Sequence, residues 1–194
     1  MSDASRWARI GVLGGSFDPP HCGHSLLGAY ALSVAPIDGL IVVPAFSHAF
    51  GKAMAPFEHR VAMARAAFSV LDPGRVAVSE IERDLPPPSY TYRTLEALQE
   101  RLPRASFRWI VGSDIVKETS RWTRIERVTE LAPFFVIGRG GHGTADSESA
   151  PLDLPEVSST HVREALRAGR GAQGLVSSAV EAYIADHGLY RGSP

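Results

Sequence analysis

The feature that most constrains the fold is a glycine turn placed directly after a short apolar run near the N-terminus. The run is Ile10–Leu13, and residues 14–24, which follow it, read GGSFDPPHCGH. A short apolar run predicts a buried strand, and two adjacent glycines let the backbone turn sharply and approach a ligand closely. The pattern therefore predicts a strand, a turn and then a helix whose N-terminus faces the bound ligand.

Each part of this turn suits a phosphate group. The backbone amides of Ser16–Phe17 can point at an anion. We expect Asp18 to cap the following helix and Pro19–Pro20 to occupy its first turn. His21 and His24 are three residues apart, so they fall on one face at the positive end of the helix dipole. The turn therefore predicts a polyphosphate site.

A second motif near the C-terminus predicts another half of the same site. Residues 157–167 read VSSTHVREALR, in which Ser158 or Ser159 is a natural N-cap for a helix. The free N–H groups of that helix and the hydroxyls of Ser159 and Thr160 form an anion cradle. Arg163 lies one helical turn after Ser159, so it reaches the same phosphate.

The order of apolar and helical segments predicts an α/β fold with a doubly wound, mostly parallel sheet. Strand-like runs occur at Arg9–Leu13, Gly39–Val43, Arg75–Val78, Phe107–Val111 and Phe134–Ile137. Helical patterns cover about Pro20–Val34, Pro56–Leu71, Thr91–Leu102 and a broken region over Asp114–Leu131. Right-handed crossovers bring the carboxyl ends of such strands to one side of the sheet, where ligands bind.

Length and composition narrow the class of protein. The 194 residues favour a single domain, 1–194, in which helices over 160–190 complete the phosphate site. A net charge of −1 gives no general attraction to nucleic acid or membrane. Cys22 has no second cysteine to pair with, and no secretory leader is recognisable. We therefore expect a cytoplasmic protein without a nucleic-acid or membrane partner, and the sequence leaves a homo-oligomer open.

The two phosphate motifs together resemble those of the His-x-Gly-His nucleotidyltransferases. These enzymes attach AMP or CMP to an acceptor that carries a phosphate. Residues 14–24 hold the His-x-Gly-His signature, and residues 157–163 are similar to the Ile-Ser-Ser-Thr-x-Ile-Arg signature of the same enzymes. The resemblance implies a Rossmann-like nucleotidyltransferase fold and adenylyl transfer from ATP, with Mg²⁺ carried on ATP and no metal site built from protein side chains.

Three further segments resemble the nicotinate and nicotinamide mononucleotide adenylyltransferases. They are Pro88–Thr91, the run 110–114 with Trp122 shortly after it, and the C-terminal run 183–190. The resemblance implies that amides near Thr91 hold the ring substituent of the acceptor and that Trp122 stacks on the ring. The segment 44–60 departs from the bacterial nicotinate pattern, which leaves the choice between acid and amide open, with a slight preference for nicotinate.

The resemblance also implies a set of site residues. ATP is expected to contact Gly15, Ser16, Phe17, His21, His24, Lys52, Ser159, Thr160 and Arg163. Among these, the catalytic residues are expected to be His21, His24 and Arg163. The mononucleotide is expected to contact Ser16, Tyr90, Thr91, Gly112, Asp114 and Trp122.

Other functions remain open at this point. A phosphopantetheine adenylyltransferase or another His-x-Gly-His nucleotidyltransferase shares the phosphate motifs. A zinc hydrolase would use His21, His24 and Asp18, and a nucleotide-binding sensor would bind without turnover. The Gly- and Ser-rich segment 138–156 is interpreted as a surface excursion or a lid over the site.

Overall fold

Five parallel strands form one sheet in the part of the chain that the computed structural model describes, residues 4–47, 51, 53–116, 119–138 and 157–191. In the order β3-β2-β1-β4-β5, the strands are β1 (Arg9–Gly15), β2 (Gly39–Pro44), β3 (Val76–Val78), β4 (Ser106–Gly112) and β5 (Phe134–Ile137). The α-helices are α1 (Cys22–Val34), α2 (Phe57–Phe68), α3 (Thr91–Arg101), α4 (Ser113–Val116), α5 (Ile125–Leu131), α6 (Ser159–Arg167) and α7 (Ser178–Asp186). Short 3₁₀ helices are η1 (Ala4–Arg6), η2 (Ile81–Asp84) and η3 (Thr119–Arg121).

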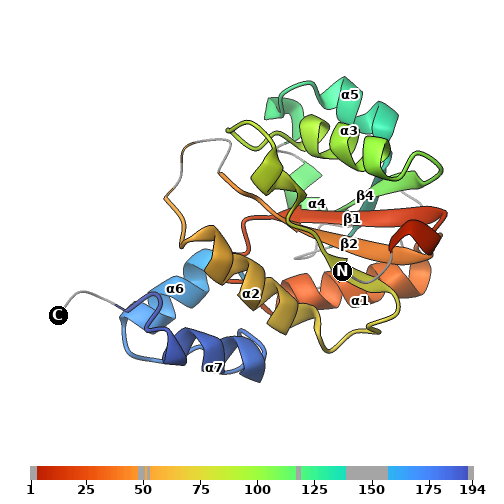
Figure 1. Ribbon diagram of the computed structural model, residues 1–194. Coiled ribbons are helices and arrows are strands. Elements are labelled where there is room, and N and C mark those ends of the chain that lie inside the picture. The colour runs from red at the N-terminus through yellow and green to blue at the C-terminus, as the bar shows by residue number, and fades with distance from the viewer. Residues whose placement is uncertain (1–3, 48–50, 52, 117–118, 139–156, 192–194) are drawn as a thin grey trace.

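Helices cover both faces of the sheet (Figure 1). Helices α3 and α5 lie on one face, whereas α1 and α2, with α6 and α7 beyond them, lie on the other. Successive strand residues point to opposite faces, so β2 sends Leu40 and Val42 toward α1 and α2 and sends Ile41 and Val43 toward α3. This double burial explains why the strands read as nearly continuous apolar runs. The predicted doubly wound fold is confirmed.

The strand order reverses beside β1. From β1 the chain passes to β2 and β3 on one side, and then crosses to β4 and β5 on the other. The carboxyl ends of β1 and β4, at Gly15 and Gly112, therefore border the switch point at which open α/β sheets bind ligands.

The turn after β1 differs from the sequence prediction. Gly14 and Gly15 are the last residues of the strand and do not form the turn themselves. A Cβ atom at Gly14 would lie 2.6 Å from the indole of Trp109, so this glycine is required for packing against β4. The left-handed backbone conformation belongs to Phe17, whose φ is 49°. The prediction that Pro19–Pro20 open the helix is wrong, because α1 begins at Cys22.

Two of the expectations lie outside the described residues. Lys52 is one, and all but the first residue of the segment 138–156 is the other. In the segments that the structure does describe, no helix combines the length and the apolar character that crossing a membrane requires.

The double-sided core leads to a prediction about stability. Leu40 in β2 is fully buried between the sheet and α1, so Leu40→Ala should lower the free energy of unfolding by about 2–5 kcal/mol. Val70 is 67% exposed, and Val70→Ala should change the same quantity by less than about 0.5 kcal/mol. Urea denaturation measures both, and similar losses would show that the assignment of β2 to the core is wrong.

Candidate active site

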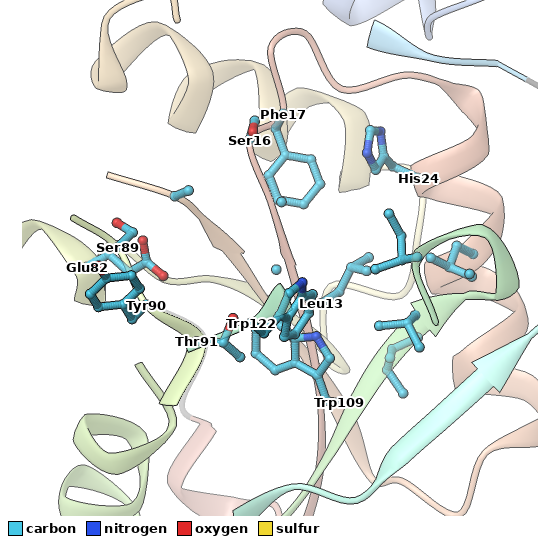
Figure 2. Close-up of a pocket in the computed structure, with 18 of the residues that line it drawn as sticks. Leu13, Ser16, Phe17, His24, Glu82, Ser89, Tyr90, Thr91, Trp109 and Trp122 are labelled. Carbon is cyan, nitrogen blue, oxygen red and sulfur yellow. The ribbon is translucent and has the colours of Figure 1, made fainter. Parts of the chain in front are cut away.

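A cavity of about 380 Å³ lies at the switch point of the sheet. The last residues of β1 and β4 form its floor, and the turn after β1, η2, the start of α3 and the start of α6 form its walls. Figure 2 shows Phe17 and His24 on one side of this cavity and Ser89, Tyr90 and Thr91 on the other. Residues that the motifs predicted as ligands and that line the cavity are Gly15, Ser16, Phe17, His24, Tyr90, Thr91, Gly112, Trp122 and Ser159.

The two histidines of the motif have different positions. The His24 side chain lines the cavity, and its Nδ1 accepts a hydrogen bond of 3.1 Å from the backbone N–H of His21. A neutral imidazole whose Nδ1 accepts carries its proton on Nε2, so His24 presents a donor on its other nitrogen. His21 is the buried N-cap residue of α1, and its ring centroid lies 3.7 Å from that of His24. The buried His21 ring therefore packs against the His24 ring.

The turn itself offers backbone donors. Ser16 and Phe17 line the cavity, and no acceptor among the described residues pairs with the N–H of either one. The Phe17 ring is buried, with edge-to-face contacts to His24 at 4.9 Å and Phe68 at 5.9 Å. These contacts stabilise Phe17 in a left-handed backbone conformation, which is unfavourable for residues other than glycine.

Arg163 and Thr160 do not line the cavity; Arg163 bonds to the turn after β1, and Thr160 bonds to Arg163. The buried Arg163 guanidinium donates from Nη1 to the carbonyl of Asp18 at 2.6 Å and from Nη2 to Thr160 Oγ1 at 3.1 Å. Ser159 Oγ donates to the carbonyl of Pro19 at 2.9 Å. Ser158 is the N-cap of α6, as one of the two predicted alternatives had it. The start of α6 is thus bonded to the turn after β1, residues 16–20, which we call the phosphate turn after the prediction from its sequence.

Asp18 does not cap α1, so that prediction is wrong. Its buried Oδ1 accepts hydrogen bonds from the Ala55 N–H at 3.1 Å and from the Tyr190 hydroxyl at 2.8 Å, while Arg163 Nη1 lies 3.8 Å from Oδ2. The carboxylate is directed toward other segments because the chain does not enter the helix until His21. In the described part of the chain no three His, Cys, Asp or Glu side chains gather to hold a metal, so the zinc hydrolase has no ligand set there.

The opposite wall of the cavity is aromatic and polar. Tyr90 is the N-cap residue of α3 and Thr91 its first residue, and Ser89 exchanges two hydrogen bonds of 3.1 Å with Ser47. Trp122 makes edge-to-face contact with Trp109 at 6.2 Å, which leaves its indole on the cavity wall (Figure 2). The backbone of Asp114 lies in α4.

Two charged residues next to this cavity were missed by the sequence motifs. Arg60 in α2 is 1% exposed, and its hydrogen bonds within the described chain all go to backbone carbonyls. Glu82 in η2 lines the cavity, and its carboxylate accepts from Thr94 Oγ1 at 2.6 Å and from the Phe46 N–H at 2.9 Å. One feature of the sequence could have indicated Arg60: it is a charged residue on the same helix face as Phe57 and buried aliphatic residues.

Comparison with known proteins identifies the class. The family model described as "Cytidylyltransferase-like" matches residues 12–165, so the chain belongs to this family. A relative from Anaeromyxobacter dehalogenans (strain 2CP-1 / ATCC BAA-258), named "Probable nicotinate-nucleotide adenylyltransferase", is 42% identical over 184 residues, which are 94% of this chain and 97% of the relative. A relative of the same name from Thermus thermophilus is 38% identical over 187 residues, 94% of this chain and 100% of its own.

A solved structure supports the same fold. The Plasmodium falciparum nicotinic acid mononucleotide adenylyltransferase complexed with NaAD superimposes with a TM-score of 0.79. It is 22% identical and the match covers 94% of this chain and 97% of that one, so it is similar in fold. The resemblance indicated by the sequence motifs is therefore confirmed.

The contact between Tyr190 and Asp18 predicts an alkaline effect on stability. Burial raises the pKa of the Tyr190 hydroxyl above its ordinary value, and the Asp18 carboxylate raises it further. The folded protein therefore keeps this proton at a pH where the unfolded chain loses it. The resulting stability is complete below about pH 10, the ordinary tyrosine pKa, and is lost as the pH rises above it.

Replacing Tyr190 tests this prediction. Tyr190→Phe should cost about 1.5–3 kcal/mol at pH 7, since a hydrogen bond to a charged group is lost, and should flatten the decline of Tm above pH 10. Tyr30 is not among the described residues that bond to the Asp18 carboxylate, so Tyr30→Phe is the matched control. An alkaline decline of equal steepness in Tyr190→Phe would contradict the prediction.

Proposed function

We propose that the protein transfers the AMP group of ATP to nicotinate mononucleotide, releasing pyrophosphate and forming the dinucleotide of NAD biosynthesis. One observation carries the proposal: a single cavity joins the phosphate turn with His24 to the wall that contains Tyr90, Thr91 and Trp122. A nucleotide triphosphate on the first side and an aromatic mononucleotide on the second meet within that volume. The names of the relatives support the same acceptor.

The reaction is an in-line displacement at phosphorus. An oxygen of the acceptor's 5′-phosphate attacks the α-phosphorus of ATP, the bond to the bridging oxygen of the β-phosphate breaks, and pyrophosphate leaves with those electrons. Two anions must be brought together, so positioning and charge stabilisation supply most of the rate enhancement. No nucleophilic side chain is required.

On the ATP side, the donors are neutral groups of the cavity wall. We assign His24 Nε2–H and the N–H groups of Ser16 and Phe17 to phosphate oxygens, with Gly15 beside them. Ser159 adds the N-terminus of α6. We assign His21 to the support of His24, which its buried position behind that ring favours.

Three other residues were predicted to contact ATP: Arg163, Thr160 and Lys52. Arg163 joins α6 to the turn through the Asp18 carbonyl, and Thr160 accepts a hydrogen bond from Arg163. We propose that the Arg163 charge and the Thr160 dipole act on the phosphates without direct contact. The domain 1–194 then uses its C-terminal helices to complete the phosphate site. Lys52 remains a proposed phosphate contact from outside the described residues.

On the acceptor side, we propose that Trp122 stacks on the pyridine ring and that amides near Tyr90 and Thr91 hold its carboxylate. An oxidised pyridine ring is cationic and suits an indole face. Gly112, the last residue of β4, and Asp114, in α4, are proposed to contact the mononucleotide, Asp114 at its ribose.

We propose that the metal of the reaction is Mg²⁺ carried on ATP. The Glu82 carboxylate in the cavity wall already accepts from Thr94 and Phe46, and the remaining donors named above suit phosphate oxygens. These residues fit Mg²⁺ that arrives bound to ATP and water, where it neutralises phosphate charge. We propose a cytoplasmic enzyme whose partners are its nucleotide substrates, with no nucleic-acid or membrane partner.

An acceptor panel tests the proposed function. The purified protein is supplied with ATP and Mg²⁺ and with nicotinate mononucleotide, nicotinamide mononucleotide or phosphopantetheine, and pyrophosphate release is followed by a coupled assay. Nicotinate mononucleotide should give the highest kcat/KM. A value at least about tenfold higher for the amide, or turnover with phosphopantetheine alone, would overturn the proposed acceptor.

His24 provides a test of the phosphate side. His24→Ala should lower kcat by about 100- to 1000-fold, because a donor aimed at charge developing in the transition state is lost, while the Kd for ATP changes much less. His161 on α6 is exposed, and His161→Ala is the matched control. A nearly normal kcat in His24→Ala would remove this residue from the reaction.

Trp122 provides a test of the ring wall. Trp122→Ala should raise the KM for the mononucleotide about 2- to 30-fold, the equivalent of a cation–π contact worth about 0.5–2 kcal/mol. The KM for ATP should stay within about twofold of the wild-type value, and Trp122→Phe should recover part of the loss. An unchanged mononucleotide KM in Trp122→Ala would place the ring elsewhere.

A further inference from the structure

Arg60 is a buried cation that touches the phosphate turn without lining the cavity. Its guanidinium makes four hydrogen bonds within the described chain, all to backbone carbonyls. Nη1 donates to Ser16 at 2.8 Å and to Ala45 at 2.7 Å, Nη2 donates to Phe46 at 3.3 Å, and Nε donates to Ala55 at 2.8 Å. One side chain on α2 thus joins the turn after β1 to the segments on both sides of the region 48–54.

Burying a guanidinium charge is unfavourable, so the hydrogen bonds that Arg60 makes in the interior are important for keeping it there. Burial lowers the pKa of the Arg60 guanidinium, and the nearby carboxylates of Asp18 and Glu82 oppose that effect. Among the described residues neither carboxylate bonds to Arg60: Asp18 accepts from Ala55 and Tyr190, and Glu82 accepts from Thr94 and Phe46. The Arg60 donors are therefore reserved for carbonyl oxygens.

The bond to Ser16 fixes the direction of the next N–H. The carbonyl of Ser16 and the N–H of Phe17 belong to one peptide plane, and in a trans peptide they point in opposite directions. The Ser16 carbonyl is bonded to Arg60, which does not line the cavity, whereas Ser16 and Phe17 do, so we infer that the Phe17 N–H on the opposite side of the peptide is directed toward the cavity. No acceptor among the described residues satisfies that N–H.

The turn would not keep this peptide orientation without contacts from other segments. Phe17 has a φ of 49°, a left-handed conformation that is unfavourable for a residue with a Cβ. A rotated Ser16–Phe17 peptide would relieve this conformation and would turn a carbonyl oxygen toward the phosphates. The surrounding contacts must therefore select one of the two orientations.

We propose that Arg60 is the positioning residue that locks the Ser16–Phe17 peptide with its N–H facing a phosphate oxygen of the bound nucleotide. The inference rests on the proposed function for the identity of that nucleotide. It assigns to Arg60 a role in the reaction that is exercised through the turn, without contact to substrate. Lysine is not an adequate substitute, because one ammonium group cannot reach carbonyls on separate segments as the planar fork does.

Substitution of Arg60 tests the inference with activity and with binding. Arg60→Lys should lower kcat/KM for ATP about 10- to 100-fold, the range expected when a hydrogen bond to a charged group is lost. It should weaken the binding of inorganic tripolyphosphate, measured by calorimetry, by at least about tenfold. The KM for the mononucleotide should change by less than about threefold, since Glu82 and Ser89 still hold Phe46 and Ser47.

Two variants on the same helix separate positioning from loss of stability. Arg65→Lys alters an arginine that is exposed and paired with Glu80, and it should leave both measurements unchanged. Met63→Ala removes a fully buried side chain and should lower Tm without changing tripolyphosphate binding at temperatures well below that Tm. If Met63→Ala and Arg60→Lys lose affinity in parallel, Arg60 acts through stability alone and the inference is overturned.

A measurement on the wild-type protein covers the case in which Arg60→Lys does not fold. The backbone amide resonance of Phe17 should shift on titration with tripolyphosphate, as expected for a donor to the bound anion. A Phe17 resonance that stays in place at saturation would overturn the inference. Wild-type protein that binds tripolyphosphate through Phe17 yet transfers AMP to no acceptor would refute the proposed function and leave this inference supported.

Discussion

The site depends on two buried guanidinium groups that hold the carbonyls of an irregular turn. Arg60 takes the carbonyl of Ser16, and Arg163 takes that of Asp18. Neither carbonyl lies within a strand or helix, and buried backbone groups without partners are costly. Each arginine comes from a different helix, α2 or α6, so the turn acquires its shape only when both helices have packed. The shape of the proposed phosphate site therefore depends on the assembled fold.

The same dependence extends to the C-terminal end of the described chain. The Tyr190 hydroxyl donates to Asp18, a residue 172 positions earlier, and Ser159 on α6 donates to Pro19. Helix α7, which follows α6, packs against α2, the helix that supplies Arg60. These contacts join α2, α6 and the C-terminal segment to the turn after β1. A change at Tyr190 can thus reach the turn after β1 through Asp18, a buried side chain that does not line the cavity.

Much of this architecture could be predicted from the sequence because it rests on periodic patterns. The five apolar runs predicted the five strands. The motifs also predicted Ser158 as a possible helix cap and His24 as a site residue, and the structure has Ser158 capping α6 and His24 lining the cavity. Asp18 was wrongly predicted to cap α1, because a capping residue must lie directly before the helix. Two prolines separate Asp18 from the point at which α1 begins. The partners of Arg60 could not be read at all, since backbone carbonyls are identical in every residue.

In the proposed site, the cations are separated from the groups that contact substrate, which would allow one cavity to accept two anions. The donors on the phosphate wall, His24 and the amides of Ser16 and Phe17, are neutral groups whose direction is fixed by buried neighbours. The cationic groups Arg60 and Arg163 lie behind that wall, close to Asp18. A rigid neutral donor needs no reorganisation as charge develops on the phosphorus, and a buried cation adds a favourable field at low dielectric. Because both cations are already bonded to carbonyls, we expect them to stay in place when pyrophosphate leaves, so the proposed phosphate wall would stabilise the transition state without trapping the product.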